Sequence, residues 1–131
     1  MYEVTEQYGF IATHQIHGLS QAHPCAGVHS HRWIAEVVLT VGALLPTDGP
    51  SELVVLEPLR RYFGRELEGR HLNDLLLGAP TPARLAWHVA AWCQENLTSY
   101  AAMSLSAIIV SSGANSRVRY TVPRSAKSAA R

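Results

Sequence analysis

The chain has 131 residues, of which 47% are hydrophobic and 16% charged, and its formal net charge is +1. This length and composition predict one globular domain, and the near-neutral charge argues against nucleic acid or an anionic membrane as partner. The apolar runs are too short to span a bilayer and no secretory leader opens the chain, so we expect a cytoplasmic protein. Both cysteines are then expected to be reduced thiols. The sparse charge favours a homo-oligomer, because association covers apolar faces.

Two N-terminal segments alternate between apolar and polar residues, which indicates half-buried strands. In residues 2–14 the inward face ends in a histidine, His14. In residues 29–41 the inward face begins with two histidines, His29 and His31, and continues through Trp33, Ala35, Val37, Leu39 and Val41. Residues 15–28, which contain two glycines and a proline, are expected to form a loop that carries Cys25.

The middle of the chain carries turn and helix signals. Residues 42–51 are expected to form a turn region, and residues 53–56 (Leu-Val-Val-Leu) a short buried strand. Pro58 suits the first position of a helix, which Gly69 ends. Thr81, followed by Pro82, has the sequence of an N-cap for a second helix that ends near Leu97.

Two further strands are predicted over residues 103–111 and 117–122, followed by a disordered tail over residues 123–131. The element order favours a single α+β domain over residues 1–122. We expect an antiparallel four-stranded sheet with two helices on one face.

The histidines are the main candidates for chemistry. His29 and His31 are two residues apart on a strand and point to the same side. If His14 lies on the neighbouring strand, the three imidazoles form the ligand set of an open zinc site. The alternative is that each is a core histidine bonded to a neighbour. Cys25, close to the pair, is a candidate nucleophile or base, because a cation nearby stabilises its thiolate.

Several motifs together resemble the 6-pyruvoyl-tetrahydropterin synthase family, which includes the 6-carboxy-tetrahydropterin synthases of queuosine synthesis. The family patterns are F-x-A-x-H, C-x3-H-G-H, G-M-V-x-D-F-x-x-L, L-D-H-x-x-L-N and P-T-x-E-N. The matching segments here are Phe10–His14, Cys25–His31, residues 51–61, residues 67–73 and Pro80-Thr81. The resemblance runs in order from about Tyr8 to Tyr120.

The resemblance implies a T-fold, which closes into a barrel when subunits associate, usually as a trimer or hexamer. It implies zinc held by His14, His29 and His31, with Cys25 moving protons in a lyase reaction on a pterin. In the family an Asp-His pair completes the acid–base work, and a late glutamate binds the amino-pyrimidine edge. The resemblance also places Thr81 among the substrate-binding residues.

This sequence departs from the family at four positions. Glu68 stands at the aspartate and Gly69 at the catalytic histidine, while His71 falls on a variable position. Ser111 or Ser112 replaces the late glutamate that binds the amino-pyrimidine edge, and the count back from Tyr120 favours Ser112. A hydroxyl cannot make the paired charge-assisted bonds of a carboxylate. Ala83 replaces the glutamate of P-T-x-E-N.

Three hypotheses follow from these departures. The first is a zinc-binding homologue acting on an altered, less pterin-like small molecule, such as another heterocycle. The second is a genuine pterin synthase whose acid–base group has moved to Glu68 or His71. The third is a non-catalytic oligomer that binds metal or senses a ligand.

Overall fold

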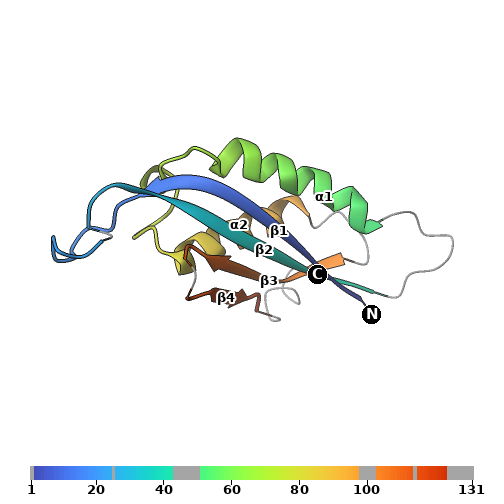
Figure 1. Ribbon diagram of the computed structural model, residues 1–131. Helices are drawn as coiled ribbons and strands as arrows, with labels where there is room; N and C mark the ends of the chain where they lie inside the picture. Colours follow the sequence, from blue (N-terminus) through green and yellow to red (C-terminus); the bar gives the residue numbers. More distant parts are fainter. Residues whose placement is uncertain (1, 25, 43–50, 98–102, 114, 124–131) are drawn as a thin grey trace.

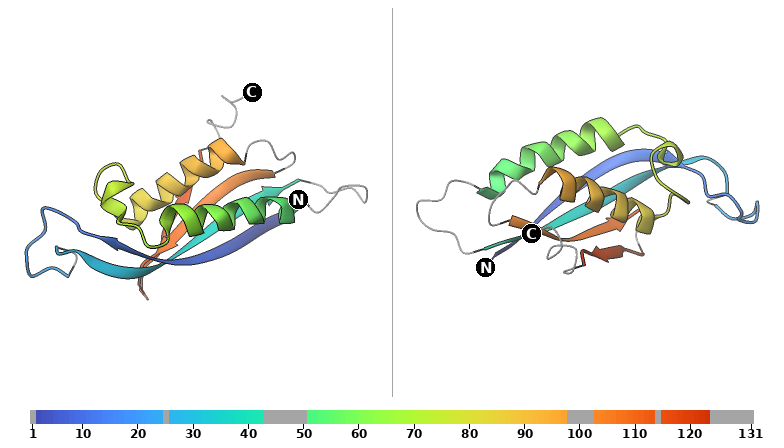
Figure 2. Two further views of the ribbon diagram at one scale, coloured as in Figure 1. Left: turned by 90° about the horizontal axis from the view of Figure 1, so that it is seen from above. Right: turned by 180° about the vertical axis from the view of Figure 1, so that it is seen from behind.

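The computed structural model describes residues 2–24, 26–42, 51–97, 103–113 and 115–123, with the backbone alone for residues 51–56. Two layers make up the molecule, a curved antiparallel sheet and two helices that lie on one of its faces (Figures 1 and 2). Cys25, residues 43–50 of the turn expected over residues 42–51, and residues 124–131 of the disordered tail expected over residues 123–131 lie outside the described residues.

The sheet has four strands in the order β1-β2-β3-β4. Strands β1 (Tyr2–His14) and β2 (His29–Val41) form a long hairpin. Strand β3 (Met103–Ser111) pairs with β2 through an irregularity at Val38 and Leu39, and β4 (Val118–Thr121) pairs with β3. All four strands were predicted from the sequence, with the last one shorter than expected.

One face of the sheet and the helices enclose the main core. Alternate residues of β1 and β2 supply its sheet side, namely Tyr8, Phe10, Ala12, Trp33, Ala35, Val37 and Leu39. Trp33 is fully buried, and its indole N–H donates to the carbonyl of Ala12 at 3.2 Å. This hydrogen bond links β2 to β1 two residues away from His31 and His14.

The first helix, α1 (Ser51–Tyr62), corrects the sequence interpretation. Residues 53–56 belong to the helix and not to a buried strand, and Pro58 lies inside the helix and not at its first position. An apolar run of four residues fits either periodicity, so the run alone could not decide. A proline inside a helix costs one backbone hydrogen bond, which made an N-terminal position the better expectation.

The helix ends confirm the other capping signals. After α1 a π-helical turn spans Phe63–Leu67, and Gly69 then adopts φ +75°, a conformation that favours glycine. The second helix, α2 (Pro82–Asn96), begins after Thr81, whose side chain accepts a hydrogen bond from the Arg84 N–H. It ends at Asn96 with Leu97 as its C-cap, close to the end that the sequence predicted.

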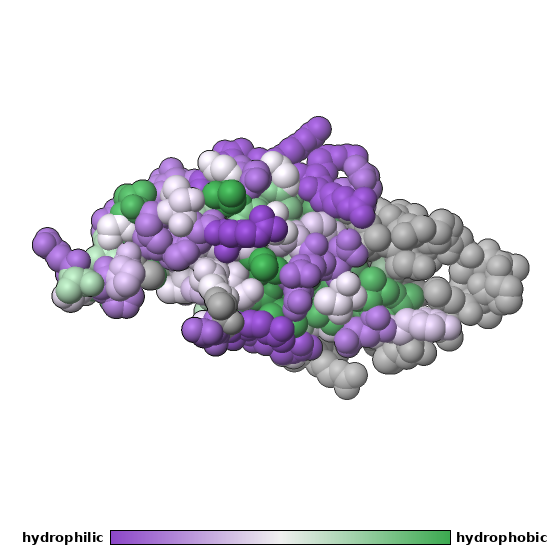
Figure 3. Space-filling model, in the orientation of Figure 1, coloured by the Kyte–Doolittle hydropathy of each residue, from purple (hydrophilic) through white to green (hydrophobic). Residues whose placement is uncertain are grey.

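The sheet face away from the helices also carries apolar side chains. Val38, Ala107 and Ile109 form a small buried cluster there. Figure 3 shows apolar residues among hydrophilic neighbours on this side of the molecule. Within the part of the chain that the structure describes, no helix is long and apolar enough to cross a membrane.

Candidate metal centre

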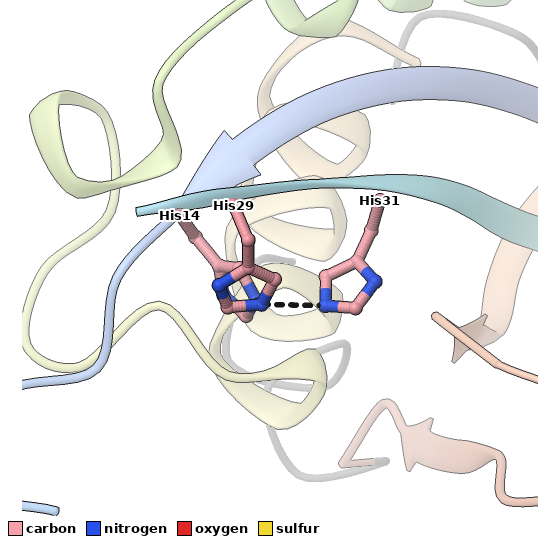
Figure 4. A group of neighbouring side chains, drawn as sticks. All are labelled: His14, His29 and His31. Carbon is pink, nitrogen blue, oxygen red and sulfur yellow. Dashed lines mark hydrogen bonds between the residues drawn. The ribbon is translucent and has the colours of Figure 1, made fainter. Parts of the chain in front are cut away.

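Three histidines lie close together at the end of the β1–β2 hairpin where the connecting loop begins (Figure 4). His14 is the last residue of β1 and pairs in register with His29, the first residue of β2. His31 lies two residues further along β2, opposite Ala12. The alternation of the strands therefore brings the three side chains to one face, as the sequence predicted.

The ring nitrogens of the group face one another. The Nε2 atom of His29 lies 2.9 Å from His14 Nε2 and 2.7 Å from His31 Nε2. One ligand atom from each residue can be chosen so that all lie within 4.8 Å of one another. Three imidazole nitrogens thus converge on one point.

Backbone carbonyls hold the opposite side of two rings. His14 Nδ1 lies 2.8 Å from the carbonyl oxygen of Pro80, and His29 Nδ1 lies 2.7 Å from that of Gly27. A carbonyl accepts only, so each Nδ1 carries the proton and each Nε2 presents its lone pair to the group. This is the tautomer that a metal-ligating histidine uses.

Burial keeps the histidines in the ligand-competent form. His14 is 2% exposed, and its ring packs against the indole of Trp33 with centroids 4.9 Å apart. Burial lowers the pKa of His14, and the neighbouring His29 and His31 lower it further. Burial also lowers the pKa of His31. Both imidazoles are therefore neutral at pH 7.

The donor set fits a zinc ion. Three neutral histidines with a fourth position open are a known zinc ligand set, and Zn–N bonds of about 2.0–2.1 Å place tetrahedral ligands about 3.3 Å apart. The Nε2 atom of His29 needs to move by only a few tenths of an ångström from those of His14 and His31 to meet that spacing. Other first-row metals accept the same ligands.

Residues 68–73, named here the edge strap, run along the outer edge of β1. The N–H of Ile11 donates to Glu68 Oε2, the N–H of Gly69 donates to the carbonyl of Ile11, and the N–H of Thr13 donates to the carbonyl of Arg70. The strap covers an otherwise unpaired strand edge. The carboxylate of Glu68 is thereby bonded to the backbone of β1.

The structure places His71 apart from the three histidines. Its Nδ1 bonds to the Thr13 hydroxyl at 2.9 Å, and Thr13 points to the strand face opposite His14. The His71 charge still contributes to lowering the pKa of His14. His71 therefore lies near the candidate metal centre but outside the group.

The remaining predicted site residues have distinct places. Thr81 caps α2 directly after Pro80, whose carbonyl holds His14. Ser111 ends β3, opposite Ile34, and the partly buried Ser112 follows it in a bend. Gly69 stands in the strap with open space around its Cα hydrogen, so no neighbouring atom excludes a side chain there.

Sequence analysis missed two residues that support the site. The Asn73 side chain makes two hydrogen bonds with the backbone of Gln15, which directly follows His14. The pair is separated by 58 residues in the chain. Asn73 matches the last letter of the L-D-H-x-x-L-N pattern, which was the one available signal, but the pattern alone names no partner.

Fold and site together define a class: an α+β protein with a three-histidine candidate metal centre at the end of a long hairpin. A family model described as 6-pyruvoyl tetrahydropterin synthase matches residues 3–123, and the chain belongs to this family. Its four-stranded antiparallel sheet with two helices is a T-fold. Both the family and the fold class predicted from the sequence are confirmed.

Two solved structures illustrate the likeness. The fold is similar to that of 6-pyruvoyl tetrahydropterin synthase from Caenorhabditis elegans, with TM-score 0.73, 19% identity, and 94% of this chain and 98% of that chain covered. It is also similar to an uncharacterized protein from Wolinella succinogenes, with TM-score 0.71, 13% identity, and coverage of 93% and 98%. A search of curated proteins finds no significant match to the sequence.

Proposed function

We propose that this protein is a zinc-binding member of the 6-pyruvoyl tetrahydropterin synthase family that acts on a small molecule other than the pterin substrate. The convergence of the imidazoles of His14, His29 and His31 supports the metal part of this proposal. Bound zinc would supply a Lewis acid for a hydroxyl or carbonyl oxygen of the ligand. The reaction class that the family suggests is a lyase.

The changed substrate is inferred from the other half of the site. At position 69 a glycine with φ +75° stands where the resemblance expects a catalytic histidine, and glycine neither donates nor accepts a side-chain proton. Ser112, or Ser111, stands at the pterin-binding glutamate and offers one hydroxyl in place of two charged oxygens. We propose Ser112 and Thr81 as ligand-binding residues for this altered molecule.

Turnover of dihydroneopterin triphosphate by the zinc-loaded protein tests the proposal. A positioned proton donor contributes about a hundred-fold or more to such reactions, so the rate is expected to be slower by at least that factor than for an ordinary synthase. Turnover at ordinary enzymatic rates would overturn the changed-substrate proposal. A thermal-shift screen of pterins, purines and pyrimidines, with His31→Ala as the metal-free control, then searches for the preferred ligand class.

A second candidate function is a pterin synthase with a relocated acid–base group. The contact between His71 Nδ1 and the hydroxyl of Thr13, the residue before His14, favours it. In this case His71→Ala abolishes turnover, and an unchanged rate excludes His71. For Glu68 to take this role, its carboxylate would first have to break its hydrogen bond with the Ile11 N–H.

Replacement of Cys25 distinguishes a catalytic protein from one that only binds a metal or ligand. As base or nucleophile, Cys25 is required for turnover, so Cys25→Ala abolishes the reaction while zinc content stays the same. If function in cells or in an assay is unaltered in Cys25→Ala, the protein is a non-catalytic metal-binding or ligand-sensing oligomer. Cys93→Ala is the control for general loss of a thiol, since Cys93 is buried in the core.

We also propose that the chain assembles as a trimer or hexamer. Strands β1 and β4 are the outer strands of the sheet order, and the hydrogen bonds of the edge strap to β1 lie around Ile11–Gln15 in the part of the chain that the structure describes. The remaining edges of these strands can pair with those of neighbouring subunits and close a barrel. Light scattering after size-exclusion chromatography measures the number of subunits, and a monomer would contradict this proposal.

A further inference from the structure

The end of β1 needs an anchor of its own if His14 is to hold a fixed position. The pairing of β1 with β2 ends at His14 and His29, so Gln15 is the first residue beyond the strand pair. A ligand at the last position of a strand moves whenever the following backbone frays. The side chain of Asn73 holds that backbone.

The Asn73 amide makes two hydrogen bonds with one residue. Its Oδ1 accepts from the Gln15 N–H at 2.9 Å, and its Nδ2 donates to the Gln15 carbonyl at 2.7 Å. The amide therefore substitutes for the next residue of a paired strand and extends the sheet pattern past His14. A bidentate contact of this kind fixes both position and orientation of the peptide units on either side of Gln15.

Asn73 itself is held in a short turn that the core anchors. The 3-10 turn Leu72–Asp74 contains Leu72, which is fully buried. The same connecting segment supplies the Pro80 carbonyl that bonds His14 Nδ1. This segment thus contacts the end of β1 in two ways. Asn73 bonds to the backbone of Gln15, and the Pro80 carbonyl bonds to the ring of His14.

The contact also extends to the second ligand. The Gln15 side-chain Nε2 donates to the carbonyl of Ala26 at 3.0 Å, and the adjacent carbonyl of Gly27 accepts from His29 Nδ1. One hydrogen-bond network therefore runs from Asn73 through Gln15 to the residues that orient His29.

We propose that Asn73 is a positioning residue for the metal centre, which sets the affinity of the three histidines for zinc by fixing the backbone at Gln15. The inference rests on the proposed metal binding. Residues that support metal ligands typically contribute about 10–100-fold to metal affinity. Asn73→Ala is therefore expected to weaken zinc binding by about tenfold or more without removing any ligand.

Zinc affinity, measured by competition with a chromophoric chelator at a temperature where every variant is folded, tests the inference. Asp74→Asn is the matched control, because Asp74 is exposed in the same turn, and it should bind zinc like the original chain. The cobalt-loaded form gives a second readout, since a displaced His14 alters the visible absorption bands of tetrahedral Co²⁺. A purely structural role for Asn73 would lower the melting temperature of the apo protein and leave both readouts unchanged, which would overturn the inference.

Asn73→Asp covers the case in which Asn73→Ala does not fold. It keeps the acceptor for the Gln15 N–H and loses only the donor to the Gln15 carbonyl. The added negative charge by itself favours a cation, so a weaker zinc affinity in Asn73→Asp supports positioning, and an equal or tighter affinity contradicts it. If the unaltered chain binds no zinc at all, the proposed function itself fails, an outcome distinct from failure of the Asn73 inference.

Discussion

His14 and His31 serve the same proposed ion, yet their replacement by alanine should have very different effects on the stability of the apo protein. His14 is 2% exposed, and its loss leaves the buried Pro80 carbonyl without its N–H donor. An unpaired buried carbonyl costs about 1–3 kcal/mol. The cavity beside Trp33 adds about 1–2 kcal/mol, in keeping with other large-to-small core changes. His14→Ala is therefore expected to lower the free energy of unfolding by about 2–5 kcal/mol.

His31→Ala removes a partly exposed ring whose Nε2 bonds to that of His29. Loss of one ordinary hydrogen bond costs about 0.5–1.5 kcal/mol. Urea unfolding with a chelator present, at pH 8, which is above the ordinary pKa of histidine, measures both variants on the same scale. Equal losses, or a larger loss for His31→Ala, would refute the account of how His14 is held.

Three further predictions concern stability. Free zinc at 100 times its dissociation constant should stabilise the protein by about 2.7 kcal/mol, and His29→Ala should abolish that gain in a thermal melt. The Tyr8 and Tyr62 hydroxyls are buried with no hydrogen-bond partner among the described residues, and burial raises both pKa values. Tyr62→Phe should leave the urea midpoint equal or higher; a loss above 1 kcal/mol would reveal a hidden partner. Burial lowers the pKa of His88, so the unfolded chain takes up a proton first as pH falls below about 6.5. The free energy of unfolding of the apo protein should therefore fall as the pH is lowered below about 6.5, and it should fall less steeply in His88→Gln. An identical dependence on pH in the two proteins would exclude His88 as a cause of this loss of stability.

The strand alternation made the metal half of the site predictable from the sequence. Side chains along a strand alternate between the two faces of a sheet, so a shift of the pairing by one residue would place His14 on the face opposite His29 and His31. The observed register pairs His14 with His29, and all three side chains reach one face. The Thr81 cap and the Gly69 helix end were predictable for a similar reason, since both depend on local backbone chemistry.

The misassigned helix and the supporting contacts have a different origin. Residues 53–56 formed an apolar run too short to reveal its period, and Pro58 pointed to a helix start that lies earlier, at Ser51. The contact between Asn73 and Gln15 joins distant segments, and an asparagine in a loop gives no sign of the backbone it will meet. Local patterns therefore predicted the ligands, while the residues that position them required the fold.

The central claim is that the three histidines bind a metal ion, and elemental analysis of purified protein tests it most directly. The account predicts about one zinc ion per chain in the original protein and none in the variant in which His14, His29 and His31 are all alanine. A metal-free original protein that takes up no zinc on addition, or a triple variant that retains the metal, would contradict it.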